Sequence, residues 1–437
     1  MLIAPRVNMS LRRFQVVLGG VCALATLGFL GVRAQAQTQP ASSATPTTVD
    51  TGRGPLTGST RFIGLGGAFV AIAQDTDGIA VNPAATGLRL PYSWSEWDWG
   101  LGVDVAIGAW LPKNKYYNRP DNDNVQSSTT IFGSLAGVVY RNQFGVGVAA
   151  EAQRNAAIRN DAALGISTSL AANFGIVHAV AAYGFVDGQL LLGGGFRFVG
   201  MSWDRHNGGS AGLTPAGVGY EAGAIWKPTA KQYRIGAAFK SAADAKVPSA
   251  SDQTSTIHVP WELAFGAAYQ FGAKPLNPRF VTAKQMARDE NGGVEPTVAQ
   301  IKQAERGLYE AYQAVDTYYL LVSTELLVLE SSSHGGFDQY WSEGERQPIE
   351  GVILSPRLGL ESEVVPHILR VRAGSYYESP LVGGTTGRLH GTTGLDVRLF
   401  SWSVFGLLEP FDYWRLSLAV DGAREYLNTG ISIGFWH

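Results

Sequence analysis

Apolar and polar positions alternate along most of the chain, from about residue 92 to the C-terminus. In WELAFGAAYQF, residues 261–271, one face carries large apolar side chains and the other carries Glu262, Gln270 and small residues. Residues 233–240, 369–378 and 415–421 repeat this alternation, with arginine on the minor face. A period of two indicates β-strands with one apolar face and one polar face.

These strands have the length and chemistry of a transmembrane barrel rather than of a soluble sandwich. Strands that cross a membrane alternate over about ten residues, whereas strands in soluble sheets usually run for about 5 to 6 residues. Aromatic residues stand at strand ends, where interfacial girdles lie in such barrels; they include Trp97, Trp99, Trp261, Phe271 and Phe435. We therefore predict an all-β fold, a 14-stranded antiparallel transmembrane β-barrel with an N-terminal luminal hatch. The predicted strands are 93–111, 128–140, 143–153, 162–186, 189–203, 216–227, 231–240, 258–272, 316–331, 350–362, 367–378, 389–408, 411–421 and 426–436.

The connections between these strands support the count. With the C-terminus on the periplasmic side, the tight connections all fall on that side and the long polar loops fall outside the cell, as in outer-membrane barrels. The tight connections are 141–142, 187–188, 228–230, 364–366 and 409–410, and the long loops are 112–127, 204–215, 241–257, 332–349 and 379–388.

One connection, residues 273–315, is long and yet periplasmic. Within it, residues 296–315 space Val298, Ile301 and Leu308 at helical intervals, which predicts a helical insertion with one apolar face. Two interpretations stand: the helix caps the barrel mouth, or it presents a docking surface for a periplasmic protein partner.

The first 36 residues have the three-part order of a secretory signal peptide. A basic start, an apolar stretch over 14–32 and the small-residue site Ala34-Gln35-Ala36 follow one another. We predict cleavage after Ala36 and a polar linker over 37–60; a single membrane anchor is the alternative. The only cysteine, Cys22, lies inside the predicted signal, so the mature chain offers no thiol nucleophile, no cysteine-ligated zinc and no disulfide.

Composition excludes several classes of function. The 34 Lys and Arg nearly balance the 36 Asp and Glu, so the chain lacks the basic footprint of a nucleic-acid-binding protein. After residue 36 no apolar run reaches the roughly 20 residues that a transmembrane helix needs. The histidines are scattered and no Gly-x-Ser-x-Gly occurs, so nothing predicts a catalytic triad. We expect no enzyme activity, no cofactor and no metal site.

Residues 61–88, RFIGLGGAFVAIAQDTDGIAVNPAATGL, do not alternate. Their glycines do not form a phosphate loop, because no Gly-Lys-Ser/Thr follows and no βαβ alternation surrounds them. The DTDG at Asp75 to Gly78 has a calcium-like spacing but lacks the acidic ligand expected further along. The segment is apolar and precedes the first strand, so we predict a hatch over 61–91 folded into the barrel lumen. Asn82 is expected to cap a turn or helix that Pro83 starts.

The same stretch resembles the N-terminal hatch of the FadL-type outer-membrane transporter family. The matching features are the glycines from 64 to 67, the region around Asp75 and the triplet Asn82-Pro83-Ala84, with the first strand following directly. The resemblance implies a Gram-negative outer-membrane channel for passive uptake of long-chain fatty acids or hydrocarbons. It also implies lateral escape near a kink in the third strand, where Gly145 and Gly147 stand. The wider superfamily includes type IX secretion shuttle barrels, so a barrel that binds a protein partner is the alternative.

The final strand, TGISIGFW at 429–436, resembles the C-terminal signal that the barrel-assembly machinery reads in outer-membrane proteins, with His437 added after the aromatic pair. We thus expect that machinery, outer-membrane lipid and a hydrophobic small molecule or fatty acid as partners. Lumen charges that either pair across the wall or contact a ligand carboxylate are Arg234, Glu262, Arg370 and Arg372, together with Arg357, Glu361 and Arg415. The hatch and ligand-binding candidates are Phe62, Gly64, Gly66, Gly67, Phe69, Asp75, Asn82, Pro83 and Ala84.

Overall fold

The protein is described by a computed structural model, which covers the following residues: 48–50, 54–89, 95–108, 125–161, 166–205, 214–248, 254–315, 318–331, 351–380, 386–401 and 413–436. The predicted signal peptide, most of the predicted linker and His437 lie outside the described residues.

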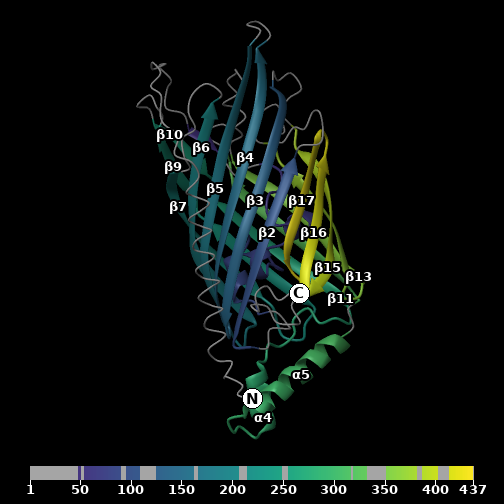
Figure 1. The fold of residues 1–437 in the computed structure, drawn as a ribbon. Helices are drawn as coiled ribbons and strands as arrows, with labels where there is room; N and C mark the ends of the chain where they lie inside the picture. Colours follow the sequence, from purple (N-terminus) through teal and green to yellow (C-terminus); the bar gives the residue numbers. More distant parts are fainter. Residues whose placement is uncertain are drawn as a thin grey trace.

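Fourteen of the described strands form one closed antiparallel barrel, as the alternation predicted (Figure 1). Neighbouring strands in the wall follow chain order, and the last strand closes onto the first. The wall strands are β2 (Trp97–Gly108), β3 (Val125–Arg141), β4 (Phe144–Asp161), β5 (Ile166–Phe185), β6 (Leu190–Arg205), β7 (Thr214–Trp226), β8 (Tyr233–Lys240), β11 (Glu262–Gly272), β12 (Tyr319–Glu330), β13 (Val352–Val365), β14 (Leu369–Glu378), β15 (Arg388–Ser401), β16 (Tyr413–Ala423) and β17 (Tyr426–Phe435).

The outer face of the wall is apolar and the inner face is not. On β11, Phe265 and Phe271 are 49% and 55% exposed, whereas Ala268 on the other face is buried. Large apolar side chains are exposed in the same way on other strands, for example Ile235 and Leu320. Such a continuous apolar surface is not stable in water, and a closed ladder satisfies the backbone hydrogen bonds that lipid cannot. The outer face therefore contacts the membrane. Among the described helices, none has both the length and the apolar character needed to span a bilayer.

Residues 54–89 lie inside the barrel, and we call them the luminal segment. It contains the helices α2 (Thr60–Gly64) and α3 (Asp75–Gly78) and the 3₁₀ helix η1 (Pro83–Gly87). The Asn82 side chain accepts a hydrogen bond from the Ala84 N–H and caps η1, and Pro83 is its first residue, as predicted. The segment begins before the predicted boundary at residue 61, because the residues that precede it, among them Leu56 and Ser59, are also buried.

Wall glycines make room for the luminal segment. A Cβ on Gly145 would lie 1.6 Å from the Thr86 carbonyl oxygen, and a Cβ on Gly223 would lie 1.9 Å from Asn82 Oδ1. Only glycine allows the two backbones to approach this closely. Comparable close approaches, all under 3.0 Å from an added Cβ to backbone atoms of the segment, occur at Gly193, Gly236, Gly359 and Gly374. Part of the high glycine content therefore serves to seat this segment.

The kink expected in the third wall strand is absent. β4 pairs with β5 along its whole length without a register shift, and with β3 it shifts only at Val125/Ser127. Added side chains at Gly145 and Gly147 would collide with Thr86 and Ile79. These glycines provide space for the luminal segment, and they do not bend the strand.

The predicted loop 241–257 instead contains two strands. β9 (Ala243–Pro248) and β10 (Thr254–Val259) form a hairpin, and β1 (Thr48–Asp50) pairs in parallel with β10. Ala243 and Val259 pack against Phe174 and Val199 of the barrel wall. The two strands are short and rich in polar residues, so their alternation is too weak to predict them from the sequence.

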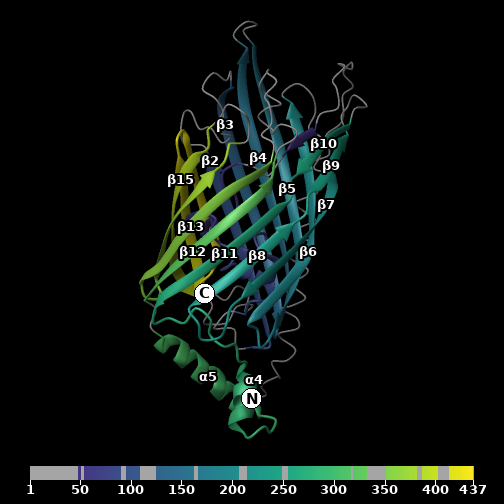
Figure 2. The same cartoon turned by 180° about the vertical axis from the view of Figure 1, so that it is seen from behind.

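The periplasmic insertion forms two helices, α4 (Ala283–Glu290) and α5 (Val298–Ala314). α5 confirms the predicted helix. Both helices extend beyond the end of the barrel (Figures 1 and 2), and they pack on each other through Ala287 and Ala304. A 2.7 Å ion pair from Lys284 to Glu295 also links the insertion, and the hydrogen bond raises the pKa of Lys284.

The residues that hold the insertion to the barrel precede the helices. Arg234 Nε donates to Asn277 Oδ1 at 2.8 Å and its Nη2 donates to the Leu276 carbonyl at 2.7 Å. The Arg89 guanidinium lies 4.7 Å from the centre of the Phe280 ring. Helix α5 was expected to cap the mouth, but residues 276–280 make these contacts and the helices project away.

Candidate functional site

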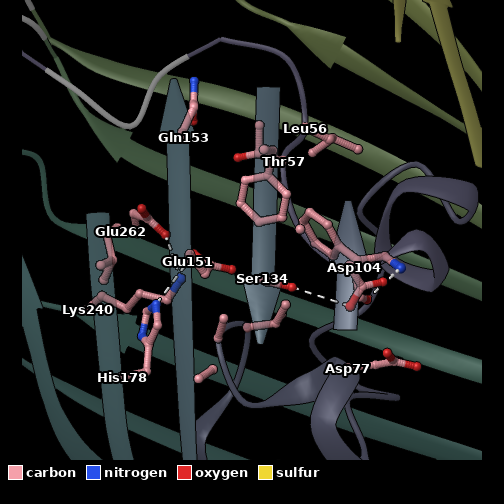
Figure 3. Close-up of a pocket in the computed structure, with 18 of the residues that line it drawn as sticks. Leu56, Thr57, Asp77, Asp104, Ser134, Glu151, Gln153, His178, Lys240 and Glu262 are labelled. Atoms are coloured by element: carbon pink, nitrogen blue, oxygen red, sulfur yellow. Dashed lines mark hydrogen bonds and ion pairs between the residues drawn. The ribbon is translucent and has the colours of Figure 1, made fainter. Parts of the chain in front are cut away.

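A cavity of about 190 Å³ lies in the lumen beside the luminal segment (Figure 3). The segment contributes Leu56, Thr57, Phe62, Asp77 and Val81 to its lining. The wall contributes an apolar part, with Phe132, Ala136, Ala149, Phe174, Ile176, Leu327 and Leu329. It also contributes a polar part, with Asp104, Ser134, Glu151, Gln153, His178, Arg197, Lys240, Glu262, Glu325 and Arg357.

The polar groups of the cavity are largely engaged with one another. Lys240 Nζ lies 3.1 Å from Glu262 Oε2, and Arg197 Nη1 lies 3.8 Å from Glu262 Oε1. Asp104 Oδ1 accepts the Thr60 N–H at 2.9 Å, and its Oδ2 accepts the Ser134 hydroxyl at 3.3 Å. The cavity thus has a charged side whose cations already have carboxylate partners.

Glu325 on β12 holds the luminal segment by its backbone. Its Oε2 accepts the N–H groups of both Phe69 and Val70, at 2.9 and 2.8 Å. Its Oε1 accepts from Arg357 at 2.9 Å, and Arg357 Nη1 also donates to the Gly67 carbonyl at 3.2 Å. Glu325 is 5% exposed. Hydrogen bonds to a buried ionised carboxylate are stronger than neutral ones, so this residue is a principal anchor of the segment.

Asn82 makes a second anchor. Its Nδ2 donates to the Val70 carbonyl at 2.9 Å and approaches the carbonyls of Ala224 and Ala237 at 3.3 Å each. One side chain therefore joins two parts of the luminal segment and two wall strands. This explains why asparagine precedes the proline at this position, since both its donors and its acceptor are used.

The calcium interpretation of Asp75 to Gly78 is wrong. The four residues form a short buried helix, α3, and Asp77 Oδ2 lies 3.2 Å from Arg415 Nη1. Asp75 is buried against β2, where an added Cβ on Gly100 would lie 2.3 Å from Asp75 Oδ1. Both carboxylates are thus directed at the wall, so they do not converge on an ion.

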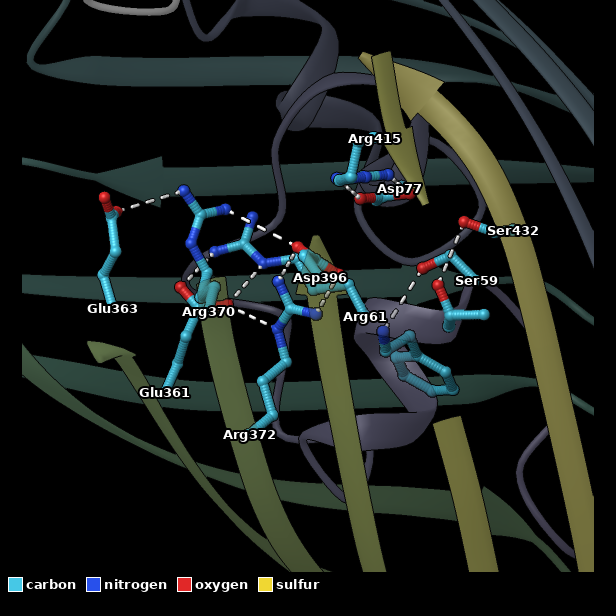
Figure 4. A network of polar contacts seen from close by, with 12 residues as sticks. Ser59, Arg61, Asp77, Glu361, Glu363, Arg370, Arg372, Asp396, Arg415 and Ser432 are labelled. Atoms are coloured by element: carbon cyan, nitrogen blue, oxygen red, sulfur yellow. Dashed lines mark hydrogen bonds and ion pairs between the residues drawn. The ribbon is translucent and has the colours of Figure 1, made fainter. Parts of the chain in front are cut away.

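A buried network of ion pairs fixes the other end of the luminal segment (Figure 4). Arg61 Nε lies 2.9 Å from Glu361 Oε2, and Arg372 Nε lies 2.6 Å from the same oxygen. Arg372 also pairs with Asp396, and Arg370 lies 3.7 Å from Asp396 and 3.6 Å from Glu363. In this network three arginines match three carboxylates. The interpretation in which lumen charges pair across the wall therefore applies to Arg370 and Arg372.

The sequence-predicted residues occupy three places. Phe62 and Glu262 line the cavity. Arg234 is at the insertion and Arg370 and Arg372 are in the ion network, as described above. The rest lie where the luminal segment meets the wall: Gly64, Gly66, Gly67, Phe69, Asp75, Asn82, Pro83 and Ala84.

Several residues at the site were not predicted. Glu325, Asp104 and Glu151 occupy inward positions of alternating strands, and that position was the available signal. His390 was dismissed as isolated, yet it lies 2.9 Å from Asp421 Oδ1 and 2.8 Å from Glu378 Oε2. These contacts join strands whose partners cannot be paired before the register is known.

The fold and the site define a membrane-spanning β-barrel whose lumen holds an N-terminal segment and an adjoining cavity. No protein-family model and no curated protein matches the chain. Among solved structures, the CymD monoaromatic hydrocarbon channel is similar with a TM-score of 0.49 and 15% identity, covering 86% of this chain and 96% of that one. The toluene transporter TodX of Pseudomonas putida is similar with a TM-score of 0.48 and 11% identity, covering 88% and 99%. These are likenesses of the barrel fold.

Proposed function

We propose that this protein is an outer-membrane channel of the FadL type for passive uptake of hydrophobic molecules. The observation that carries the proposal is the partly apolar cavity in the lumen, placed against a segment that is buried inside the barrel and resembles a FadL-type hatch. A simple water-filled pore would not contain such a segment. Long-chain fatty acids and hydrocarbons are the two substrate classes that the resemblance implies.

Capture needs no energy source. Each CH₂ group that leaves water contributes about 0.8 kcal/mol, and the apolar part of the cavity offers the surface for it. The cavity of about 190 Å³ compares with the roughly 150 Å³ cavity in another protein that binds benzene. A molecule with one ring fits, so small hydrocarbons are the better supported class at this position.

Release requires movement of the luminal segment, of the wall, or of both. The ladder between β17 and β2 is the shortest among the described wall strands: it pairs Val103 to Ile107 with Thr429 to Ile433. Residues 97–102 of β2 have partners only on β3. The side chains of Asp75 and Thr76 in α3 lie against Gly100 and Gly102 of this stretch. We therefore place the exit between β17 and β2, with α3 as the part that moves, instead of at the third strand.

The test is uptake by Gram-negative cells whose lipopolysaccharide layer excludes hydrocarbons. Cells with and without the protein are given radiolabelled toluene or a long-chain fatty acid at low concentration. The expected result is faster toluene uptake that does not depend on the proton gradient. Equal uptake of both compounds in the two strains would contradict the proposal.

A second candidate function is a barrel that binds a protein partner, and one observation favours it. The α4–α5 hairpin projects from the barrel, and Val294 and Val298 on it are 63% and 70% exposed. Removal of residues 283–314 separates the two functions. A stoichiometric partner lost on deletion, with no hydrocarbon uptake by the intact protein, would favour the protein-binding function.

A further inference from the structure

We propose that the cavity selects a neutral hydrophobic molecule that carries one hydroxyl group, such as a phenol, and rejects carboxylates of the same size. This inference rests on the proposed function, since it names the substrate class of the same cavity. The polar end of the ligand would be held by His178 and Glu151.

His178 is the first part of the argument. It lines the cavity and is 1% exposed. Its Nδ1 is 2.7 Å from Glu221 Oε1, whose side chain is fully buried behind it. Its Nε2 is a buried atom without a hydrogen-bond partner among the described residues. A buried polar atom left without a partner destabilises the protein, and a ligand in the cavity can supply that partner.

Glu151 is the second part. Its Oε2 lies 3.6 Å from His178 Nε2, beyond a good hydrogen bond, and its side chain is 20% exposed. Figure 3 shows the Glu151 and His178 side chains turned toward each other at the cavity. A hydroxyl carries one donor and can also accept. It therefore fits between the two groups, donating to Glu151 and accepting from His178 Nε2–H, with Nδ1–H directed at Glu221.

The charges around the cavity exclude an anionic head group. Glu151 and Glu262 are the carboxylates with the most exposed side chains among the cavity ion pairs, at 20% and 21%. The nearby cation, Lys240, is 3.1 Å from Glu262, and Arg357 is 2.9 Å from Glu325. A ligand carboxylate would lie among like charges and would have to displace an existing partner. Like charges that meet in a partly buried site are strongly unfavourable.

The apolar part of the ligand is accommodated beside these groups. Ala149 precedes Glu151 by two residues on β4, and Ile176 precedes His178 by two residues on β5, so each points into the lumen with its polar neighbour. Phe174 continues the same face. The apolar and polar groups thus lie side by side, as a ring with a hydroxyl substituent requires.

The test compares three ligands of one shape: p-cresol, toluene and p-toluate. Binding to the purified full-length protein in detergent is measured by calorimetry at pH 7.5, where p-cresol is neutral and p-toluate is an anion. The expected order is p-cresol first, then toluene, then p-toluate. The expected preference for p-cresol over toluene is roughly tenfold or more, the effect of one hydrogen bond to a charged group.

Two variants test the assignment. Glu151→Gln and His178→Gln should each reduce the preference for p-cresol over toluene while toluene affinity stays within about twofold, and Glu151→Gln should also improve p-toluate binding. Glu310→Gln on α5, outside the barrel, makes the same chemical change and should alter nothing. Equal affinities for p-cresol and toluene in the wild type, or an unchanged preference in both variants, would overturn the inference. If the preference holds but cells show no hydrocarbon uptake, the transport function fails and the binding site stands.

Discussion

Replacing Glu325 by alanine tests whether the luminal segment is held shut by its backbone anchors. The carboxylate accepts two N–H groups, from Phe69 and Val70, and alanine accepts neither. Hydrogen bonds to charged groups contribute about 1.5 to 3 kcal/mol each, so the seated position should lose about 3 to 6 kcal/mol relative to a displaced one. That corresponds to a roughly hundredfold to ten-thousandfold change in the equilibrium between the two positions.

The assay is conductance in planar lipid bilayers, with the frequency and duration of openings counted per barrel. Glu325→Ala should open at least about a hundred times more often than the wild type. Glu325→Gln keeps one neutral acceptor oxygen, so it should fall between the two. Heat-modifiable migration on gels first confirms that each variant has folded as a barrel. A correctly folded Glu325→Ala protein with wild-type conductance would refute the reasoning, because it would mean that these bonds do not hold the segment or that the segment does not move.

Three further predictions concern the seat, the lipid face and the exit. Gly223→Ala places a Cβ 1.9 Å from Asn82 Oδ1 and should expose the luminal segment to protease. Gly307→Ala meets no atom and should stabilise α5 by about 0.5 to 1 kcal/mol. Leu326→Arg puts a charge on a lipid-facing position that is 42% exposed. It should lower the unfolding free energy in liposomes by up to about 2 to 4 kcal/mol; no loss would argue against lipid contact there. Ala106→Cys with Gly430→Cys places Cβ atoms about 3.7 Å apart, suited to a disulfide. Oxidation should slow uptake and reduction should restore it, whereas uptake indifferent to oxidation would exclude the exit between β17 and β2.

The barrel was predictable because its signal is local. A strand such as β11 shows its lipid face and its luminal face within eleven residues, so the period of two suffices to locate it. β9 and β10 escaped prediction because each is six residues long and carries few apolar residues to set a period. The same limit explains the misplaced start of the luminal segment, whose first residues are small and polar but are buried by the barrel around them.

The site was predictable only in part because its contacts join distant residues. Inward alternation placed Arg370 and Arg372 in the lumen, but it did not reveal Arg61 as a member of the same network, 300 residues from its partner Glu361. Glycine was also ambiguous. Gly145 and Gly147 can permit either a kink or a close approach, and only the position of Thr86 shows that the second use is the real one.

The most direct test of the central claim is to lock the luminal segment to the wall. Thr76 in α3 and Gly102 on β2 place their Cβ atoms about 3.3 Å apart, close to the 3.5 to 4.5 Å of a disulfide, and the only native cysteine is Cys22. Toluene uptake is measured in cells that carry the double-cysteine variant, before and after oxidation, with each single-cysteine variant as a control. A channel that opens by movement of this segment predicts uptake that falls on oxidation and returns on reduction. Uptake at the same rate in the locked and reduced forms would contradict it.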